Sequence, residues 1–267
     1  AIVLDNPLDS NKKHLRLDLK DSLINNLLYN ERRQKDSVKL FEISNTYKKN
    51  RDNPFPSEYN KLGVIVSGRV GQNYIDFQKK IDAKFIRNVL NEFIEIDTNI
   101  EEICRDDLDT KNKSKIFYFE INLDEIKIKN NNIHKNKRFN FIKYKKISDF
   151  PSSTRDFSFL ISDLSKYEIF MNSIEKISDK NVKDSFVFDF YKNEVLNQVK
   201  VGVRIIFQSN KKTLSESEIF QSTENIIKPI IEIEGVSIPG LEYNEEISWK
   251  VWAKIYPDSQ IPFYPLS

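Results

Sequence analysis

Hydrophobic and polar residues alternate most regularly in the second half of the chain. Val201, Val203, Ile205 and Phe207 alternate with more polar neighbours, and Phe157–Ile161 shows the same two-residue period. Each segment predicts a strand with one apolar face. The β-branched and aromatic run Val182–Tyr191 predicts a third strand, and helical spacing of apolar residues in Tyr167–Ile177 predicts a helix.

A second helix of this region has a recognisable start. Ser215 and Glu218 have the spacing of a capping box, and the apolar face that follows is expected to end at Pro229. Ile231–Ile238 then supplies the last predicted strand. The order over residues 148–241 is β-α-β-β-α-β, the split arrangement of a ferredoxin-like domain. A fold of this kind does not by itself define a function.

The first half of the chain shows a different pattern, which predicts an antiparallel sheet. Asp21 or Ser22 is expected to cap a helix with an apolar stripe. Val38–Tyr47 and Leu62–Ser67 predict paired strands, with the polar stretch Lys48–Asn60 as their long hairpin loop.

A helix and a further strand are predicted after this hairpin. Apolar residues recur every four positions from Phe77 to Phe93, so a helix is expected to start near Asp76. The acidic stretch Glu92–Asp109 is interpreted as a solvated surface, and Ile116–Ile121 predicts another strand. The overall prediction is an α+β protein of two domains.

The domain boundaries follow changes in composition and charge. With 267 residues and 39% hydrophobic content, the chain is long enough for two cores. Residues 1–126 form the first predicted domain, 127–147 a linker, 148–241 the ferredoxin-like domain, and 242–267 a tail of unassigned role. The linker is basic and carries aromatic residues, which fits either RNA contact or a simple lysine-rich connector. The formal net charge of the whole chain, +2, gives no argument for nucleic acid.

Cysteine and histidine content excludes several classes of site. The single cysteine, Cys104, cannot form an intramolecular disulfide, and His14 and His134 lie too far apart in sequence for a zinc motif. No apolar run is long enough to cross a membrane and no signal peptide is recognisable, so a cytoplasmic protein without membrane contact is expected.

Three motifs of the second half match a known family in order and spacing. They are FPSSTRD at Phe150–Asp156, FDFY at Phe188–Tyr191, and TLSESEI at Thr213–Ile219. Together they resemble the C-terminal anticodon-binding domain of the phenylalanyl-tRNA synthetase β subunit. The resemblance implies a ferredoxin-like fold and contact with the anticodon of tRNA-Phe.

The first half is similar to the preceding module of the same subunit. The matching residues are Asn6–Leu8, Leu15–Arg16, Leu28–Asn30, LFEI at Leu40–Ile43 and Asp76–Lys84. The resemblance implies a class II synthetase-like domain that lacks an active site and packs on the catalytic α subunit. The family's stretch at 94–114 is shortened here. The resemblance begins within this module, so a fragment of a longer subunit is expected.

The family's RNA-binding residues can be carried over position by position. Pro151, Asp189 and Tyr191 match positions that lie at or near the anticodon. A tyrosine can stack on an unpaired base, and an aspartate can accept a hydrogen bond from a base amino or imino group. Lys200 stands where the family has a serine, and could reach a phosphate instead. Arg204 and Lys212 are generic phosphate candidates.

No catalytic residue and no metal ligand is predicted in this chain. Neither the arginine that grips the α-phosphate nor the glycine-rich strand of a class II site is found, so ATP and Mg²⁺ are expected to bind the α subunit. The resemblance implies a non-catalytic part of a heterotetrameric ligase of protein biosynthesis. Two alternatives remain open: a truncated interaction protein that binds an α-like partner without tRNA, and a ferredoxin-like small-molecule sensor.

Overall fold

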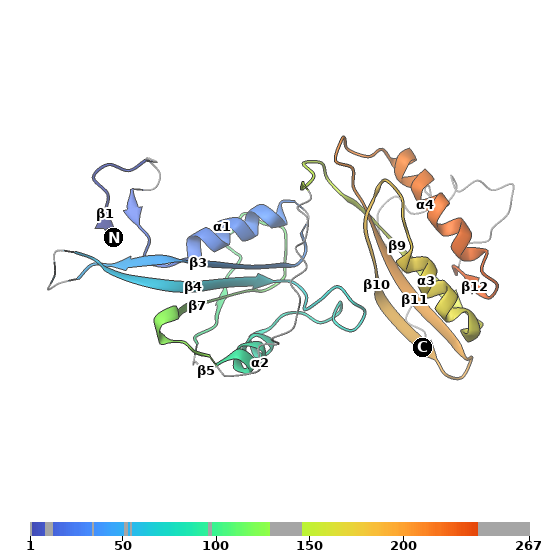
Figure 1. The fold of residues 1–267 in the computed structure, drawn as a ribbon, viewed down its shortest axis with the longest axis horizontal. Coiled ribbons are helices and arrows are strands. Elements are labelled where there is room, and N and C mark those ends of the chain that lie inside the picture. The colour runs from blue at the N-terminus through green and yellow to red at the C-terminus, as the bar shows by residue number, and fades with distance from the viewer. Residues whose placement is uncertain are drawn as a thin grey trace. The chain divides into compact units, whose positions relative to one another are not determined.

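The computed structural model describes residues 2–8, 13–33, 35–50, 53, 55–95, 98–128 and 146–239. The chain divides into two compact units, each with its own sheet (Figure 1). Unit 1 comprises Ala1–Val70 and Lys79–Phe141, and unit 2 comprises Gly71–Gln78 and Ile142–Ser267. Most of the predicted linker and the whole predicted 242–267 tail lie outside the described residues.

Unit 1 is built on an antiparallel sheet in the order β3-β4-β7-β6. Helix α1 packs on one face, where Leu23 and Leu27 meet Ile65 of β4. Helix α2 covers the other face, where Ile86 packs with Phe117 and Phe119 of β7. Its main elements are α1 (Lys20–Glu31), β3 (Val38–Lys48), β4 (Ser57–Ser67), α2 (Ala83–Phe93), β6 (Glu101–Ile103) and β7 (Ile116–Asn122).

Short elements complete unit 1. Strand β1 (Ile2–Val3) pairs with β2 (His14–Leu15), and β5 (Ile94–Glu95) pairs with β8 (Lys127–Ile128). A 3-10 turn, η1 (Leu123–Glu125), follows β7. Lys127 and Ile128, predicted to begin the linker, therefore belong to a strand of unit 1.

Two predicted details of unit 1 are wrong. The hairpin loop is shorter than Lys48–Asn60, because β3 runs to Lys48 and β4 begins at Ser57. Helix α1 begins at Lys20, and neither Asp21 nor Ser22 caps it. The Ser22 hydroxyl oxygen instead lies 3.1 Å from the Leu19 carbonyl oxygen and 2.5 Å from Glu42 Oε2, two acceptors that share its single proton.

The second helix of unit 1 begins seven residues later than predicted. Asp82 caps α2 by accepting a hydrogen bond from the Phe85 amide at 2.7 Å. Phe77 precedes the helix and belongs to unit 2, although its spacing continues the apolar pattern of α2. The regular spacing therefore joined a residue that is buried against the open side of the unit 2 sheet to a true helical stripe.

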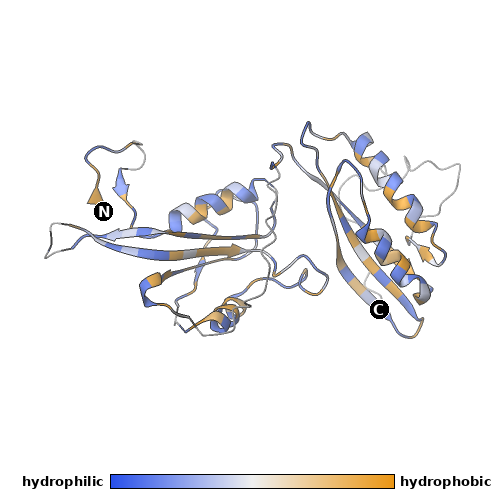
Figure 2. Cartoon of the chain, in the orientation of Figure 1, coloured by the Kyte–Doolittle hydropathy of each residue, from blue (hydrophilic) through white to orange (hydrophobic). Residues whose placement is uncertain are grey.

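Unit 2 has the predicted ferredoxin-like topology. Its sheet has the antiparallel order β10-β11-β9-β12, and α3 and α4 cover one face (Figure 1). The elements are β9 (Ser153–Ile161), the 3-10 turn η2 (Leu164–Lys166), α3 (Tyr167–Glu175), β10 (Val182–Asn193), β11 (Gln198–Phe207), α4 (Glu216–Ile231) and β12 (Val236–Ser237). Hydrophobic residues alternate along these strands (Figure 2), and those facing the helices form the core. The central strand β11 buries Val201, Val203, Ile205 and Phe207 completely.

The C-terminal end of unit 2 departs from prediction. The capping box of Ser215 and Glu218 is present, but α4 continues through Pro229 to Ile231. A proline removes one backbone hydrogen bond. Here the packing of buried Ile226, Ile227 and Ile230 against the sheet maintains the last turn. The final strand is accordingly only Val236–Ser237.

Candidate RNA-binding face

The face of the unit 2 sheet opposite α3 and α4 holds three rows of side chains across its central strands. On β11 these are Lys200, Gly202 and Arg204, which alternate with the buried core residues. The backbone register gives the rows: Tyr191, Lys200 and Leu160; Asp189, Gly202 and Ser158; Phe186, Arg204 and Asp156. We call this surface the open face.

A bulge in β10 determines which of its side chains reach the open face. The register shifts between Val187 and Asp189, and both Val187 and Phe190 pack against the core. These two core-facing residues are three positions apart, whereas a regular strand repeats every two. The inserted residue therefore moves each later side chain of β10 to the opposite face of the sheet. Tyr191 would face the core without the bulge. With it, Tyr191 lies on the open face beside Lys200.

The middle row requires a glycine. A Cβ on Gly202 would lie 2.8 Å from Asp189 Cβ and 3.0 Å from the Phe188 ring. The absence of a side chain at 202 leaves room beside β11 for the Phe188 ring and for the Asp189 side chain. Tyr191, at the next row, exposes 51% of its surface. Within the described residues, the Asp189 and Tyr191 side chains make no hydrogen bond or ion pair.

Arg204 is held by neighbouring side chains rather than directed to solvent. Its Nε and Nη2 donate to the two Asp156 carboxylate oxygens at 2.7 and 2.6 Å. Its guanidinium carbon lies 5.0 Å from the centre of the Phe77 ring and 5.3 Å from that of Phe188. This bidentate pairing and the two rings occupy the groups with which an arginine grips phosphate.

Pro151 and Lys212 lie at the opposite end of the sheet from Tyr191. Pro151 lies just before Ser153, the first residue of β9. Ser153 pairs with Phe207, which is seven residues from Lys200 along β11. At about 3.3 Å per residue this is a separation of roughly 23 Å. The structure therefore brings Asp189, Tyr191 and Lys200 together, and does not bring Pro151 to them.

Local hydrogen bonds fix this second end. The Gln208 side chain donates to the Phe150 carbonyl at 2.6 Å, which holds the segment before β9 against the end of β11. Lys212 forms an ion pair with Glu218 at 2.7 Å. This hydrogen-bonded pair, with the Ser215 amide as a further donor, lowers the pKa of Glu218 to about 2.

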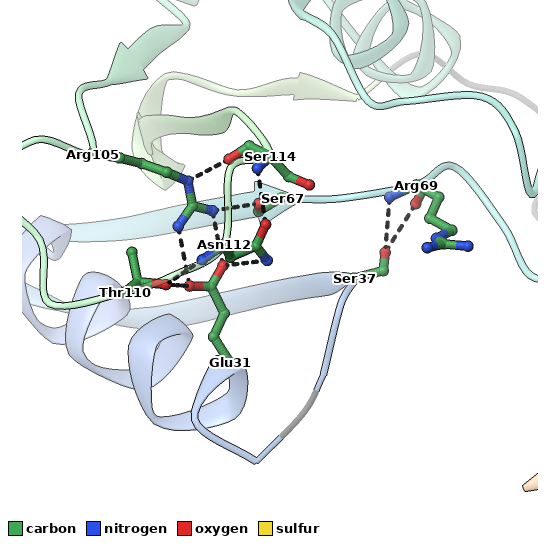
Figure 3. A network of polar contacts seen from close by, with 8 residues as sticks. All are labelled: Glu31, Ser37, Ser67, Arg69, Arg105, Thr110, Asn112 and Ser114. Carbon is green, nitrogen blue, oxygen red and sulfur yellow. Dashed lines mark hydrogen bonds and ion pairs between the residues drawn. The ribbon is translucent and has the colours of Figure 1, made fainter. Parts of the chain in front are cut away.

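A second polar cluster lies in unit 1 and joins the end of α1 to the 104–114 segment (Figure 3). Glu31 accepts hydrogen bonds from Arg105 at 2.8 and 3.1 Å, from Thr110 at 2.6 Å and from Asn112 at 3.0 Å. Arg105 also donates to Ser67 of β4 and to the Ser114 carbonyl. These partners satisfy the Glu31 carboxylate from several sides, so the cluster is structural. It anchors part of the 94–114 stretch, which the resemblance predicts to be shortened.

Other kinds of site find little support in the described residues. They contain no group of three or more His, Cys, Asp or Glu that could hold a metal ion. No helix among them is long and apolar enough to cross a membrane. His14 lies on the short strand β2, Cys104 is exposed, and His134 is outside the described residues.

Comparison with known proteins matches two separate stretches of the chain to two families. Residues 148–238 match the family described as ferredoxin-fold anticodon binding domain. Residues 1–123 match the family described as phenylalanyl tRNA synthetase beta chain CLM domain.

Several similar proteins are phenylalanine–tRNA ligase beta subunits. The chain is 25% identical over 273 residues to the chloroplastic phenylalanine–tRNA ligase beta subunit of Pyropia yezoensis, covering 86% of this chain and 37% of that protein. It is 24% identical over 266 residues to the beta subunit of Carboxydothermus hydrogenoformans, and 26% identical over 263 residues to that of Mycoplasma mycoides. Each of these two matches covers 86% of this chain and 32% of the relative.

The sheet order of unit 2 and its family match define this unit as a ferredoxin-fold anticodon-binding domain. Residues 1–123 match a second family in the expected order, and the chain is similar over 86% of its length to phenylalanine–tRNA ligase β subunits. It spans about a third of the length of these relatives.

Proposed function

We propose that unit 2 binds the anticodon region of tRNA-Phe on its open face through Asp189, Tyr191 and Lys200. The observation that carries this proposal is the bulge in β10, which turns Asp189 and Tyr191 to the same face as Lys200. The exposed Tyr191 ring can stack on an unpaired base, Asp189 can accept from its Watson–Crick edge, and Lys200 can pair with a phosphate. A role in RNA contact for Pro151, Arg204 and Lys212 stays a prediction.

The test compares binding of the full chain to the anticodon stem-loop of tRNA-Phe and to a stem-loop with a scrambled anticodon, at about 100 mM salt. Base stacking on an aromatic side chain contributes about 1–3 kcal/mol, so Tyr191→Ala should weaken native-loop binding about 5- to 150-fold. Asp189→Ala should reduce discrimination between the two loops. Tyr29→Ala is the matched control, because Tyr29 exposes 54% of its surface on α1 of unit 1. Equal binding of both loops by the folded wild type would refute the proposal.

Unit 1, in this proposal, is a class II synthetase-like module without an active site that scaffolds the catalytic α subunit. Its antiparallel sheet between two helices supports this assignment. Phe41 and Ile43 on the edge strand β3 expose 72% and 56% of their surface, an apolar pair that a partner could cover. ATP and Mg²⁺ would bind the α subunit. We place the assembly, a heterotetramer, in the cytoplasm, although one relative is chloroplastic.

A truncated interaction protein that binds an α-like partner without tRNA is the second candidate. The lysine at 200, where the family has a serine, favours it. Co-expression with an α subunit, combined with the RNA-binding assay, distinguishes the two candidate functions. Capture of α by the wild type, reduced by Phe41→Asp, combined with absent loop discrimination would support the interaction protein. Loop discrimination would exclude it.

A further inference from the structure

A short segment far upstream in the sequence is part of the unit that carries the candidate RNA site. Gly71–Gln78 precedes β9 by about 75 residues, yet it belongs to unit 2. Asn73 organises the segment: its side-chain oxygen accepts from the amides of Ile75 and Asp76, both at 3.0 Å, and its carbonyl accepts from the Phe77 amide at 2.9 Å. The result is a compact turn that carries two aromatic side chains, Tyr74 and Phe77.

Phe77 covers one end of the open face. Its ring centre lies 5.1 Å from that of Phe188 and 6.1 Å from that of Phe186, and only 8% of the residue is exposed. The Arg204 guanidinium lies against both Phe77 and Phe188 while Asp156 neutralises its charge. Phe186, Phe188 and the Arg204 cation of the open face therefore already contact another part of the chain, the Phe77 ring.

Tyr74 closes the adjoining edge of the sheet. Its ring centre lies 5.3 Å from that of Phe190, and Phe190 in turn lies 6.1 Å from Tyr167 of α3. The segment therefore contacts β10 both on the open face, through Phe77, and at the strand edge, through Tyr74. Tyr191 lies in the row beyond these contacts and stays half exposed.

The covered groups are those that would make the open face a general stacking platform. Four-stranded sheets of this kind bind single-stranded RNA when exposed aromatic rings stack two or three bases. Stacking is tolerant of sequence, because every base has a π-face. Phe186, Phe188 and Arg204, if exposed, would add two rings and a cation that bind any base. The row of Tyr191 and Lys200 lies four residues along β11 from Arg204, about 13 Å away.

We propose that the Gly71–Gln78 segment determines the specificity of RNA binding. By packing on Phe186, Phe188 and Arg204, of which Phe188 is buried and the other two are partly buried, it restricts base stacking to Tyr191, next to Asp189, which can accept a hydrogen bond from a base. An unpaired RNA base then binds only where Asp189 can also form a hydrogen bond with the edge of that base. This inference rests on the proposed anticodon binding and assigns Phe77 and Tyr74 as positioning residues that need not touch RNA.

The test measures the ratio of affinities for the native and scrambled stem-loops in the full chain carrying Phe77→Ala. Uncovered rings should strengthen binding of the scrambled loop about fivefold or more, the effect of roughly one stacked base, and the ratio should fall. Phe77→Leu keeps an apolar cover and should retain most of the ratio. Phe55→Ala, at an exposed phenylalanine of the β3–β4 loop, is the control. An unchanged ratio in folded Phe77→Ala would overturn the inference.

A measurement on the unaltered chain keeps the inference testable should Phe77→Ala fail to fold. A stem-loop carrying 4-thiouridine in the anticodon is crosslinked to the wild type, and the adducts are located by tandem mass spectrometry. Adducts are expected at Tyr191 and its neighbours. Adducts at Phe186 or Phe188 would contradict a covered platform. Failure of the proposed function is distinguishable, because the wild type would then show no preference for the native loop.

Discussion

At the scale of single residues, Glu31 and Arg105 form a largely buried ion pair. Their side chains expose 4% and 14% of their surface. Removing one partner of such a pair leaves the other charged and desolvated, which costs about 3–5 kcal/mol. Glu31→Ala should therefore lower the free energy of unfolding by about that amount in urea titrations. The matched control is Glu102→Ala, whose ion pair with Lys115 is exposed and contributes at most about 1 kcal/mol.

The same carboxylate gives unit 1 a predictable response to acid. Burial alone would raise the pKa of Glu31, but the hydrogen bonds from Arg105 and Thr110 outweigh it and hold this pKa below its ordinary value of 4.5. The unfolded chain therefore binds more protons near this pH, so stability falls as the pH drops through the folded-state pKa. Comparison of wild type with Glu31→Gln by urea unfolding should show a large difference at neutral pH that shrinks below about pH 4. A pH-independent difference would contradict this assignment.

Residue types suggested a chemistry for the open face but not its geometry. The motifs placed Asp189 and Tyr191 at the end of a strand, and the resemblance implied their role. Their common facing depends on the bulge between Val187 and Asp189, which no local residue pattern announced. The sequence made Arg204 a generic phosphate candidate. Its pairing with Asp156 and its contact with the Phe77 ring could not be predicted, because they join three distant parts of the sequence.

At the scale of elements, α4 gives a clean test of a local signal. The Ser215 hydroxyl accepts from the Glu218 amide, and the Glu218 side chain accepts from the Ser215 amide. Losing an N-cap of this type costs about 0.5–2 kcal/mol, so Ser215→Ala should destabilise unit 2 by about 1 kcal/mol in urea unfolding. Ser173→Ala in α3 is the control. Its hydroxyl donates back to the Ile169 carbonyl, an arrangement that gives a helix little stability.

Elements were predictable where one physical cause acted locally. β11 and the start of α4 follow directly from alternation and from the capping box, and both are confirmed. The start of α2 was wrong, because the four-residue spacing from Phe77 to Phe93 has two causes. Asp82 caps the true helix, whereas Phe77 is buried by Phe186 and Phe188 of unit 2. Periodicity within a window cannot reveal a contact with residues more than a hundred positions away.

At the scale of the whole molecule, the division into units does not follow the order of the sequence. The family match that defines the anticodon-binding domain covers residues 148–238, whereas the folded unit also includes Gly71–Gln78. A phenylalanine buried in a core costs about 3–5 kcal/mol when it is truncated to alanine. Phe77 is 8% exposed and its ring packs on Phe186 and Phe188, so we expect it to stabilise mainly unit 2.

This division predicts where a substitution at Phe77 will be felt. Phe77→Ala should destabilise unit 2 by about 3 kcal/mol, the low end of the cost for a buried phenylalanine, because one side of the ring adjoins the surface. Hydrogen exchange of the full chain should accelerate in peptides from β10 and β11, while peptides from β3 and β4, nearer in sequence, keep their wild-type rates. Faster exchange confined to β3, β4 and α2 would place Phe77 in the core of unit 1 instead. Ile86→Ala, in the core beneath α2, should give that opposite pattern and serves as the control.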